Sequence, residues 1–188
     1  MSPITSRIRS VVLRTLLISG LLAVGIGCGI FDPDTDDGDP PDDFQYPPLD
    51  SPQHTLTNLK LAWDKRDSTR AKQIYASDYR GTAITPESTV FFSKDQEVEL
   101  LWQLGKDPEV TWTEMVLNPE STWVVEQFPS DPADWRTIRL LKGVKLEVTK
   151  GLTTYRAQNS DIEYKFKPDT IGTTISWRIV RWQENYTP

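Results

Sequence analysis

The hydrophobic pattern of this chain changes its period after Pro108, and that change constrains the fold more than any other feature of the sequence. Before it, apolar residues recur every three or four positions, as in Leu56, Leu59 and Trp63, which is the spacing of an amphipathic helix. After it, apolar and polar residues alternate, as in residues 144–149, which is typical of a strand with one buried face. Helices followed by a run of strands predict an α+β fold.

Three helices are predicted before Pro108, and each has a start signal. The third is expected to end at Gly105 and to turn Val98, Leu101 and Trp102 towards the core. The start signals are Ser51-Pro52 for the first helix, Asp67 for the second, and Ser93 with Gln96, in the spacing of a capping box, for the third.

The strands are separated by short turn segments, so successive strands are expected to pair in the antiparallel direction. The expected strands are residues 78–85, 110–117, 122–128, 136–150, 153–164 and 175–182, and the expected breaks are Pro86 and residues 118–121, 129–132 and 167–170.

The first 27 residues have the three parts of a secretory signal peptide. Arg7, Arg9 and Arg14 precede a mostly apolar run at residues 15–24, and small residues follow it. A transmembrane helix needs roughly 20 apolar residues, and a stretch of that length would have to include Arg14 and several glycines. We therefore expect residues 1–27 to be a cleaved signal peptide. The alternatives are an uncleaved membrane anchor and a signal peptide cut at another place.

Cys28 directly follows this leader and is the only cysteine of the chain, so it has no disulfide partner within the chain. Its position resembles the lipobox of bacterial lipoproteins, although Gly25 stands where that motif usually has Leu or another aliphatic residue. The resemblance implies cleavage before Cys28 and lipid attachment to it, which would hold the protein on a membrane of the cell envelope. Gly29 follows where an aspartate would imply inner-membrane retention in many Gram-negative bacteria, and this points to the outer membrane.

Residues 28–50 are expected to be a disordered tether. Residues 29–50 contain eight aspartates, five prolines and no basic residue, and they offer few side chains to bury. Once this segment and the leader are set aside, residues 51–188 are close to neutral, although the whole chain has a formal net charge of −6. The chain therefore lacks the overall basic field that nucleic-acid binding needs, and residues 51–188 have the length of one domain.

The order of elements in residues 51–188 resembles the NTF2-like, or SnoaL-like, superfamily. The resemblance rests on the opening pair of helices at residues 56–67 and on the last strand, residues 176–184, which contains Trp177 and Trp182. It implies a strongly curved antiparallel sheet that packs against about three N-terminal helices and forms a cone with a cavity at its wide end. Members of this superfamily include enzymes, transport adaptors and inert domains, so the resemblance does not define the function.

The candidate site residues are few. His54 is the only histidine and is expected at the surface, and Glu114 and Glu126 are expected on the outer face of the sheet. One histidine and one cysteine do not supply the usual zinc ligands, so no metal, no cofactor and no catalytic residue are predicted. The aromatic residues that are candidates for the core or for lining a cavity are Trp63, Tyr75, Tyr79, Trp102, Trp112 and Trp177.

Three hypotheses for the function follow. The leading one is a membrane-tethered, non-catalytic domain that binds an envelope protein or a small apolar ligand. The second is an enzyme of the cyclase or isomerase type, in which a carboxylate buried in the cone has a tuned pKa. The third is a module that forms homodimers through its sheet. An Asp or Glu with a polar partner inside the cavity would favour the enzyme, and a cavity lined only by aromatic and aliphatic side chains would exclude it.

Overall fold

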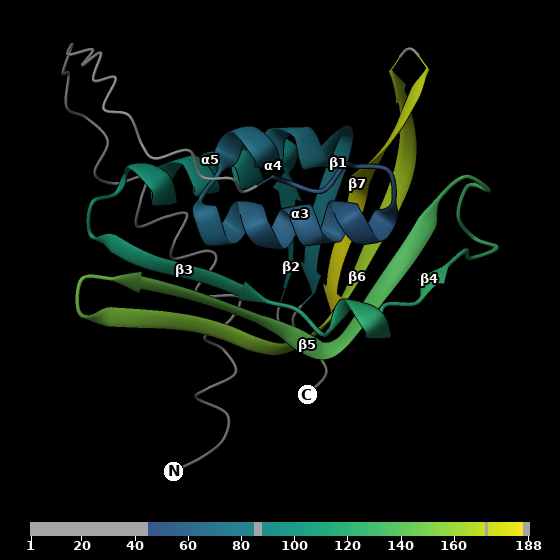
Figure 1. Cartoon of the computed structure of the whole chain (residues 1–188). Helices are drawn as coiled ribbons and strands as arrows, with labels where there is room; N and C mark the ends of the chain where they lie inside the picture. Colours follow the sequence, from purple (N-terminus) through teal and green to yellow (C-terminus); the bar gives the residue numbers. More distant parts are fainter. Residues whose placement is uncertain (1–44, 85–87, 172, 186–188) are drawn as a thin grey trace.

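The computed structural model describes residues 45–84, 88–171 and 173–185 (Figure 1). Cys28 and most of the expected tether lie outside these residues. The helices are α3 (Pro52–Lys65), α4 (Ser68–Ile74) and α5 (Lys94–Lys106). The strands are β1 (Tyr75–Ile84), β2 (Thr89–Ser93), β3 (Val110–Val116), β4 (Val125–Glu126), β5 (Arg136–Lys150), β6 (Thr153–Ile171) and β7 (Thr174–Asn185), and a 3-10 turn, η1, spans Glu120–Thr122.

One seven-stranded sheet bends round the helices, and its order is β2-β1-β7-β6-β5-β3, with β4 paired to β5 (Figure 1). This arrangement confirms the expected α+β class. It differs from the expected sheet at one pair, because β1 and β7 run parallel while the other neighbours run antiparallel. The two strands come from opposite ends of the domain, so no hairpin turn fixes their relative direction.

The expected elements match the structure best where the periodicity is long. β5 has the predicted bounds, whereas β1 begins at Tyr75 instead of Asp78 and β2 was not predicted. The expected strand at residues 122–128 shrinks to β4, because η1 occupies its beginning. β6 continues through Pro168, which lies beyond the last pair between β6 and β5, at Phe166, so the missing N–H of the proline faces no partner on that side.

A β-bulge in the middle of β5 bends the sheet towards the helices. The pairing of β5 with β6 shifts between Leu140 and Val144, and Lys142 within the bulge has a φ of 52°. The N–H of Lys142 donates to Oδ1 of Asp161 at 2.8 Å, which replaces the ladder bond that the bulge removes. Both halves of the strand therefore bury a face against the core, since the chain bends at the bulge instead of running past the helices. The buried residues on either side are Ile138, Leu140, Leu146 and Val148.

Helix α3 is fixed to the edge strand β3 by polar contacts as well as by its apolar face. Its N-cap is Ser51, as predicted, and its buried stripe contains Leu56, Leu59, Ala62 and Trp63. The hydroxyl of Thr113 lies 2.9 Å from the main-chain oxygen of Trp63, and the N–H of Met115 donates to Oδ1 of Asp64 at 2.7 Å. The latter contact uses a main-chain donor of the edge strand that would otherwise be free to pair with another strand.

Helix α5 has the predicted capping box of Ser93 and Gln96, and two of the three residues predicted for its core face contact the core. Leu101 is fully buried and Val98 is partly buried against the core, whereas Trp102 is 45% exposed. The buried residues of the helix are Glu97, Leu100, Leu101 and Leu104, so the prediction is wrong at Trp102. No helix within the described ranges is long and apolar enough to span a bilayer.

Candidate functional site

Among the described residues, a small cavity lies in the interior of the cone. It measures about 10 Å³, which is space for roughly one water molecule. The residues around it come from α3, α4–β1, α5, β3, β6 and β7 and are mostly aromatic: Leu59, Trp63, Tyr75, Tyr79, Glu97, Met115, Tyr164 and Trp182.

Glu97 is the carboxylate among the residues that line this cavity. The hydroxyl of Tyr79 donates to Oε1 of Glu97 at 3.1 Å, and these residues are 4% and 6% exposed. The ring of Tyr75 contacts that of Tyr79 with 4.4 Å between centroids. Glu97 is not among the site residues that the sequence predicts. A signal was available, because Glu97 precedes Leu100 and Leu101 by three and four positions and so lies on the buried face of α5.

Gly81 allows the strands around this pair to approach closely. A Cβ at this position would lie 2.7 Å from the hydroxyl oxygen of Tyr79, 3.0 Å from the Trp182 ring and 3.2 Å from Cβ of Phe92. The Trp182 and Phe92 rings pack edge to face at 5.8 Å. Any side chain at residue 81 would therefore push against the wall of the interior.

The structure brings together three of the six aromatic candidates. Trp63, Tyr75 and Tyr79 line the interior cavity, and Trp177 is half-buried and packs at the margin of the core. Trp102 and Trp112 do not line it: they are 45% and 55% exposed. Trp102 lies outside the buried face of α5, and Trp112 precedes Thr113, whose side chain is the one that turns to α3.

The larger depression lies on the opposite face of the sheet. Side chains alternate along β1, so Arg80 and Thr82 face away from the interior that contains Tyr79. A groove of about 230 Å³ opens on this outer face between β1, β7, β6 and the loop that precedes β5. Its lining is polar and charged apart from two tryptophans, and consists of Thr82, Asp131, Trp135, Glu163, Lys165, Arg181, Trp182 and Gln183.

A row of three cations crosses this outer face. The strand register places Arg80 opposite Arg181, and Arg181 opposite Lys165. Lys165 is neutralised by Asp131, whose carboxylate oxygens lie 2.7 and 2.9 Å from its Nζ. Neither arginine forms an ion pair with a carboxylate within the part of the chain that the structure describes. Arg181 instead donates to two main-chain oxygens, those of Asp78 and Val180, at 2.8 and 2.6 Å.

The acidic residues on the outer face are held by cations. Glu163 accepts from Arg139 at 2.7 Å, and Asp78 accepts from Lys167 at 2.7 Å, which lowers the pKa of the Asp78 carboxyl. On the outer face of β3 and β5, hydrogen bonds from Lys145 and Arg156 lower the pKa of Glu147, and Glu114 lies 3.8 Å from Lys145. Glu126 is exposed. No group of three or more His, Cys, Asp or Glu side chains in the described ranges could hold a metal ion.

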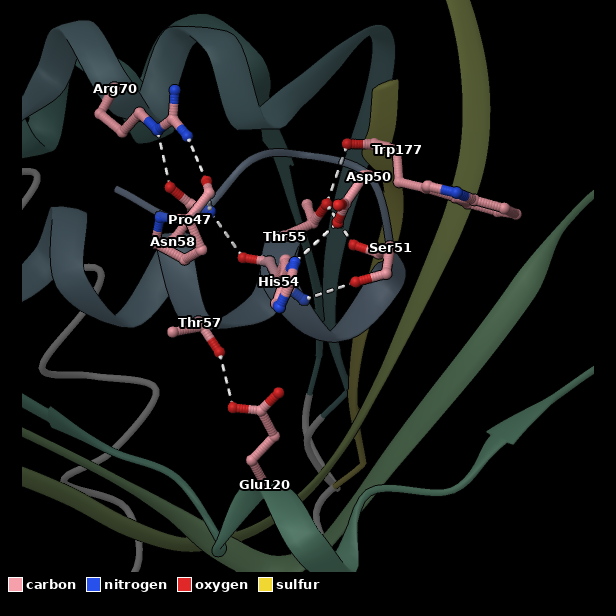
Figure 2. Close-up of polar contacts among 10 residues, drawn as sticks. All are labelled: Pro47, Asp50, Ser51, His54, Thr55, Thr57, Asn58, Arg70, Glu120 and Trp177. Carbon is pink, nitrogen blue, oxygen red and sulfur yellow. Dashed lines mark hydrogen bonds and ion pairs between the residues drawn. The ribbon is translucent and has the colours of Figure 1, made fainter. Parts of the chain in front are cut away.

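The N-terminal segment joins the domain through a polar anchor formed by Leu49 and by Pro47, Asn58, Arg70 and Trp177, of which the last four are drawn in Figure 2. The main-chain oxygen of Pro47 accepts from Nδ2 of Asn58 at 2.9 Å and from Nη2 of Arg70 at 3.0 Å. The N–H of Trp177 in β7 donates to the oxygen of Leu49 at 2.6 Å. Arg70 also donates to Oδ1 of Asn58 at 2.8 Å, so the two side chains hold each other in place.

Tyr46 extends this anchor. Its hydroxyl donates to Oδ2 of Asp67, the N-cap of α4, at 3.0 Å, and the Arg70 guanidinium lies 4.8 Å from the centre of its ring. Burial and the Asp67 carboxylate raise the pKa of Tyr46. Contacts with the domain thus begin at Tyr46, earlier than the Ser51 at which the sequence predicted the start of the domain. His54 is partly exposed, as expected, with its Nδ1 2.6 Å from Asp50 (Figure 2).

Comparison with solved structures identifies the fold. An NTF2-like superfamily protein from Salmonella enterica aligns with a TM-score of 0.50 and 14% identity, covering 71% of this chain and 86% of that one. An NTF2-like protein of unknown function in nutrient uptake from Rhodospirillum rubrum aligns with 0.50 and 13%, covering 71% and 96%. A putative Ca/calmodulin-dependent kinase II association domain from Exiguobacterium sibiricum aligns with 0.52 and 12%, covering 72% and 91%.

These similarities confirm the NTF2-like fold that the sequence predicted, and at such identities they show the fold alone. No protein-family model matches the sequence, and no curated protein matches it.

Proposed function

We propose that this chain of NTF2-like fold is a membrane-tethered, non-catalytic domain of the cell envelope that binds a partner on its outer surface. The observation that carries the proposal is the small size of the interior cavity that the described residues form. A cavity of about 10 Å³ is far below the roughly 300–1,000 Å³ of small-molecule pockets. This size supports binding on the outer surface of the domain over binding of a substrate or an apolar ligand in this cavity.

The exposed aromatic residues support binding at the outer surface. Trp102 on α5 and Trp112 on the edge strand β3 are 45% and 55% exposed, and Phe91 on the opposite edge strand β2 is 68% exposed. Large aromatic side chains supply much of the binding energy in protein interfaces because they bury a large area with few rotatable bonds. A partner protein is the ligand that such side chains fit best.

The tether rests on the sequence. The basic and apolar leader, the single Cys28 and the aspartate-rich residues after it support attachment by a lipid on Cys28, with the outer membrane as the favoured location. The anchor at Tyr46–Asp50 supports a role for the preceding segment as a link, because it fixes the point at which that segment enters the domain.

The attachment is tested by fractionating cells that produce the full chain or its Cys28→Ala variant. We expect the unchanged protein in the membrane fraction, with an acylated Cys28 as its N-terminal residue in the mass spectrum. The variant should leave the membrane fraction because it lacks the acceptor thiol. A mature protein that still begins at Met1 would contradict the attachment.

Partner binding is tested with the Trp112→Ala and Trp102→Ala variants. They should no longer cross-link to the envelope proteins that the unchanged chain captures. The control Leu152→Ala, which changes a fully exposed apolar residue, should still cross-link to them.

The enzyme alternative has one observation in its favour, the buried Glu97 with Tyr79 as its polar partner. A carboxylate with a polar partner inside the cone is the arrangement that the enzyme hypothesis predicts for an acid/base site. The small volume of the cavity supports the non-catalytic role, because a reaction needs space for a substrate beside the carboxylate. In the closed interior the pair instead satisfies two polar groups that the core has buried.

Benzene binding distinguishes a closed interior from one that opens. We expect the unchanged protein to bind no benzene, whereas Met115→Ala should bind it, because Met115 is fully buried beside the cavity and its truncation enlarges the space. The same variant should lose about 2–5 kcal/mol of unfolding free energy. Line broadening of benzene in NMR spectra provides the measurement. The non-catalytic proposal would be overturned if the unchanged protein bound benzene and the larger side chain of Leu59→Phe abolished that binding.

A further inference from the structure

We infer that the groove on the outer face of the sheet binds an organic carboxylate, with Arg181 and Arg80 holding the carboxylate oxygens and Trp135 packing against the rest of the ligand. The inference deepens the proposed binding role and rests on it only in placing the ligand outside the cone. It starts from the row of cations that the strand register brings together.

Like charges that face each other on neighbouring strands destabilise a sheet. Arg80, Arg181 and Lys165 lie in register on three adjacent strands, and among the described residues only Lys165 has carboxylates, those of Asp131 and Glu163, within ion-pair distance. Arg181 lines the groove and Arg80 lies next to it on the neighbouring strand, and neither has a carboxylate within ion-pair distance among the described residues. An oxyanion between them would remove the repulsion, which makes the groove an anion site.

The arginine side chains suit a planar oxyanion. Arg181 uses Nη1 for both of its main-chain bonds, so its Nε and Nη2 remain for a ligand. A guanidinium presents paired donors that match the two oxygens of a carboxylate, and such charge-assisted pairs are among the stronger hydrogen bonds in proteins. Arg80 on β1 lies directly beside it and is exposed.

The other lining residues favour a carboxylate over a phosphate. Asp131 and Glu163 also line the groove, and their charges would repel a dianion more than a monoanion. The Trp135 ring lies 5.6 Å from the Arg181 guanidinium carbon, so an apolar group next to the bound carboxylate would meet the ring. A volume of about 230 Å³ accommodates a group of the size of benzoate or of the last residue of a peptide.

The test uses the full-length protein in a non-ionic detergent and calorimetric titration with sodium benzoate. We expect saturable binding of benzoate and none of benzamide, which has the same ring but no charge. Arg181→Gln should weaken benzoate binding about tenfold or more, since a hydrogen bond to a charged group contributes roughly 1.5–3 kcal/mol. Arg156→Gln is the matched control: Arg156 lies on β6 and is paired with Glu147 away from the groove, so its variant should bind benzoate unchanged.

A second pair of probes identifies the source of the carboxylate. Trialanine with a free C-terminus should bind, and trialanine amide should not, if the ligand is the end of a peptide. Benzoate binding without trialanine binding assigns a free small carboxylate instead, and either result supports the site. Should Arg181→Gln fail to fold, Arg80→Gln replaces it, because Arg80 makes no hydrogen bond or ion pair within the described ranges, and it should weaken binding at least about threefold.

Three outcomes would overturn the inference: no binding of any carboxylate, equal binding by the Arg181→Gln and Arg156→Gln variants, or binding of inorganic phosphate alone. None of these bears on benzene binding or on membrane attachment. Failure of the carboxylate site and failure of the proposed function are therefore read from separate measurements.

Discussion

Two buried threonines differ only in whether their hydroxyl is bonded. Thr137 on β5 has no accessible surface, and its hydroxyl has no hydrogen-bond partner in the described part of the chain. Thr113 on β3 is 4% exposed, and its hydroxyl lies 2.9 Å from the oxygen of Trp63 and 3.1 Å from that of Asp64. Burial of the Thr137 hydroxyl without a hydrogen bond costs free energy of folding, whereas the hydrogen bonds of the Thr113 hydroxyl offset that cost.

We expect Thr137→Val to raise the unfolding free energy by about 1 kcal/mol, because it replaces an unbonded hydroxyl with a methyl group of the same shape. Thr113→Val should lower it by about 1–3 kcal/mol, because it removes the hydroxyl that donates to the buried end of α3. Urea denaturation of both variants gives the two values. A loss of stability in Thr137→Val equal to that in Thr113→Val would show that the Thr137 hydroxyl has a partner.

Single residues also show where sequence reasoning worked in the interior. Trp63, Tyr75 and Tyr79 were predicted from spacing alone, because apolar periodicity identifies the buried face of an element. Glu97 was not predicted to be buried, because a charged residue on a helix is ordinarily assigned to the solvent-exposed face. Its position beside Leu100, Leu101 and Leu104 shows that Glu97 is buried only once the orientation of α5 is known. The orientation predicted from the sequence placed Trp102 towards the core instead.

At the scale of elements, an ion pair joins the end of α5 to the end of β5. Asp107 is the C-cap of α5, and its Oδ2 lies 2.7 Å from Nζ of Lys150, the last residue of β5. The hydrogen bond from Lys150 lowers the pKa of Asp107, and the hydrogen bond to Asp107 raises the pKa of Lys150. The carboxylate also accepts from the N–H of Glu109 at 3.0 Å, which fixes the turn between helix and strand.

The pH dependence of stability follows from the lowered pKa of Asp107. Its contribution is fully present above the ordinary Asp pKa of about 3.9 and is lost as the pH falls through the lower value of the folded state. Asp107→Asn should therefore reduce stability at pH 7 and make the unfolding free energy change less between pH 5 and pH 2. Urea titrations across that range measure the slope. Exposed Asp134, which has no ion pair within the described ranges, supplies the control Asp134→Asn, whose slope should stay unchanged.

Elements differed in how well the sequence predicted them, for physical reasons. β5 alternates over fifteen residues and was predicted to its ends, whereas β2 has five residues and directly precedes the capping box, which was the stronger signal. The groove could not be predicted at all. Its row of Arg80, Arg181 and Lys165 exists only through the register of three strands that are distant in sequence, and the parallel pairing of β1 with β7 is part of that register.

At the scale of the whole molecule, the anchor at Pro47 and Leu49 decides where the domain begins. Asn58 is its centre, fully buried and bonded to Pro47, His54 and Arg70 (Figure 2). Asn58→Ala should cost about 1–3 kcal/mol, because it leaves buried groups unpaired. It should also speed hydrogen exchange at the Trp177 amide, which donates to Leu49.

Hydrogen exchange and urea denaturation of the same samples measure both effects. The control is Thr57→Ala on the same helix, whose exposed hydroxyl reaches only Glu120 and which should change stability by no more than about 0.5 kcal/mol (Figure 2). Unchanged exchange at Trp177 in Asn58→Ala would mean that the segment is held without Asn58.

The anchor also determines how the domain responds to mechanical load. A pull on the chain before Tyr46 reaches the fold first at the hydrogen bond from Tyr46 to Asp67, and then at the side chains of Asn58 and Arg70 and the Leu49–Trp177 main-chain bond. These few bonds yield before the ladders of β5, β6 and β7 are strained, because the ladders share any load over many pairs. We therefore expect tension to detach this segment from the domain, and so to lengthen the link, before it distorts the sheet and the outer groove.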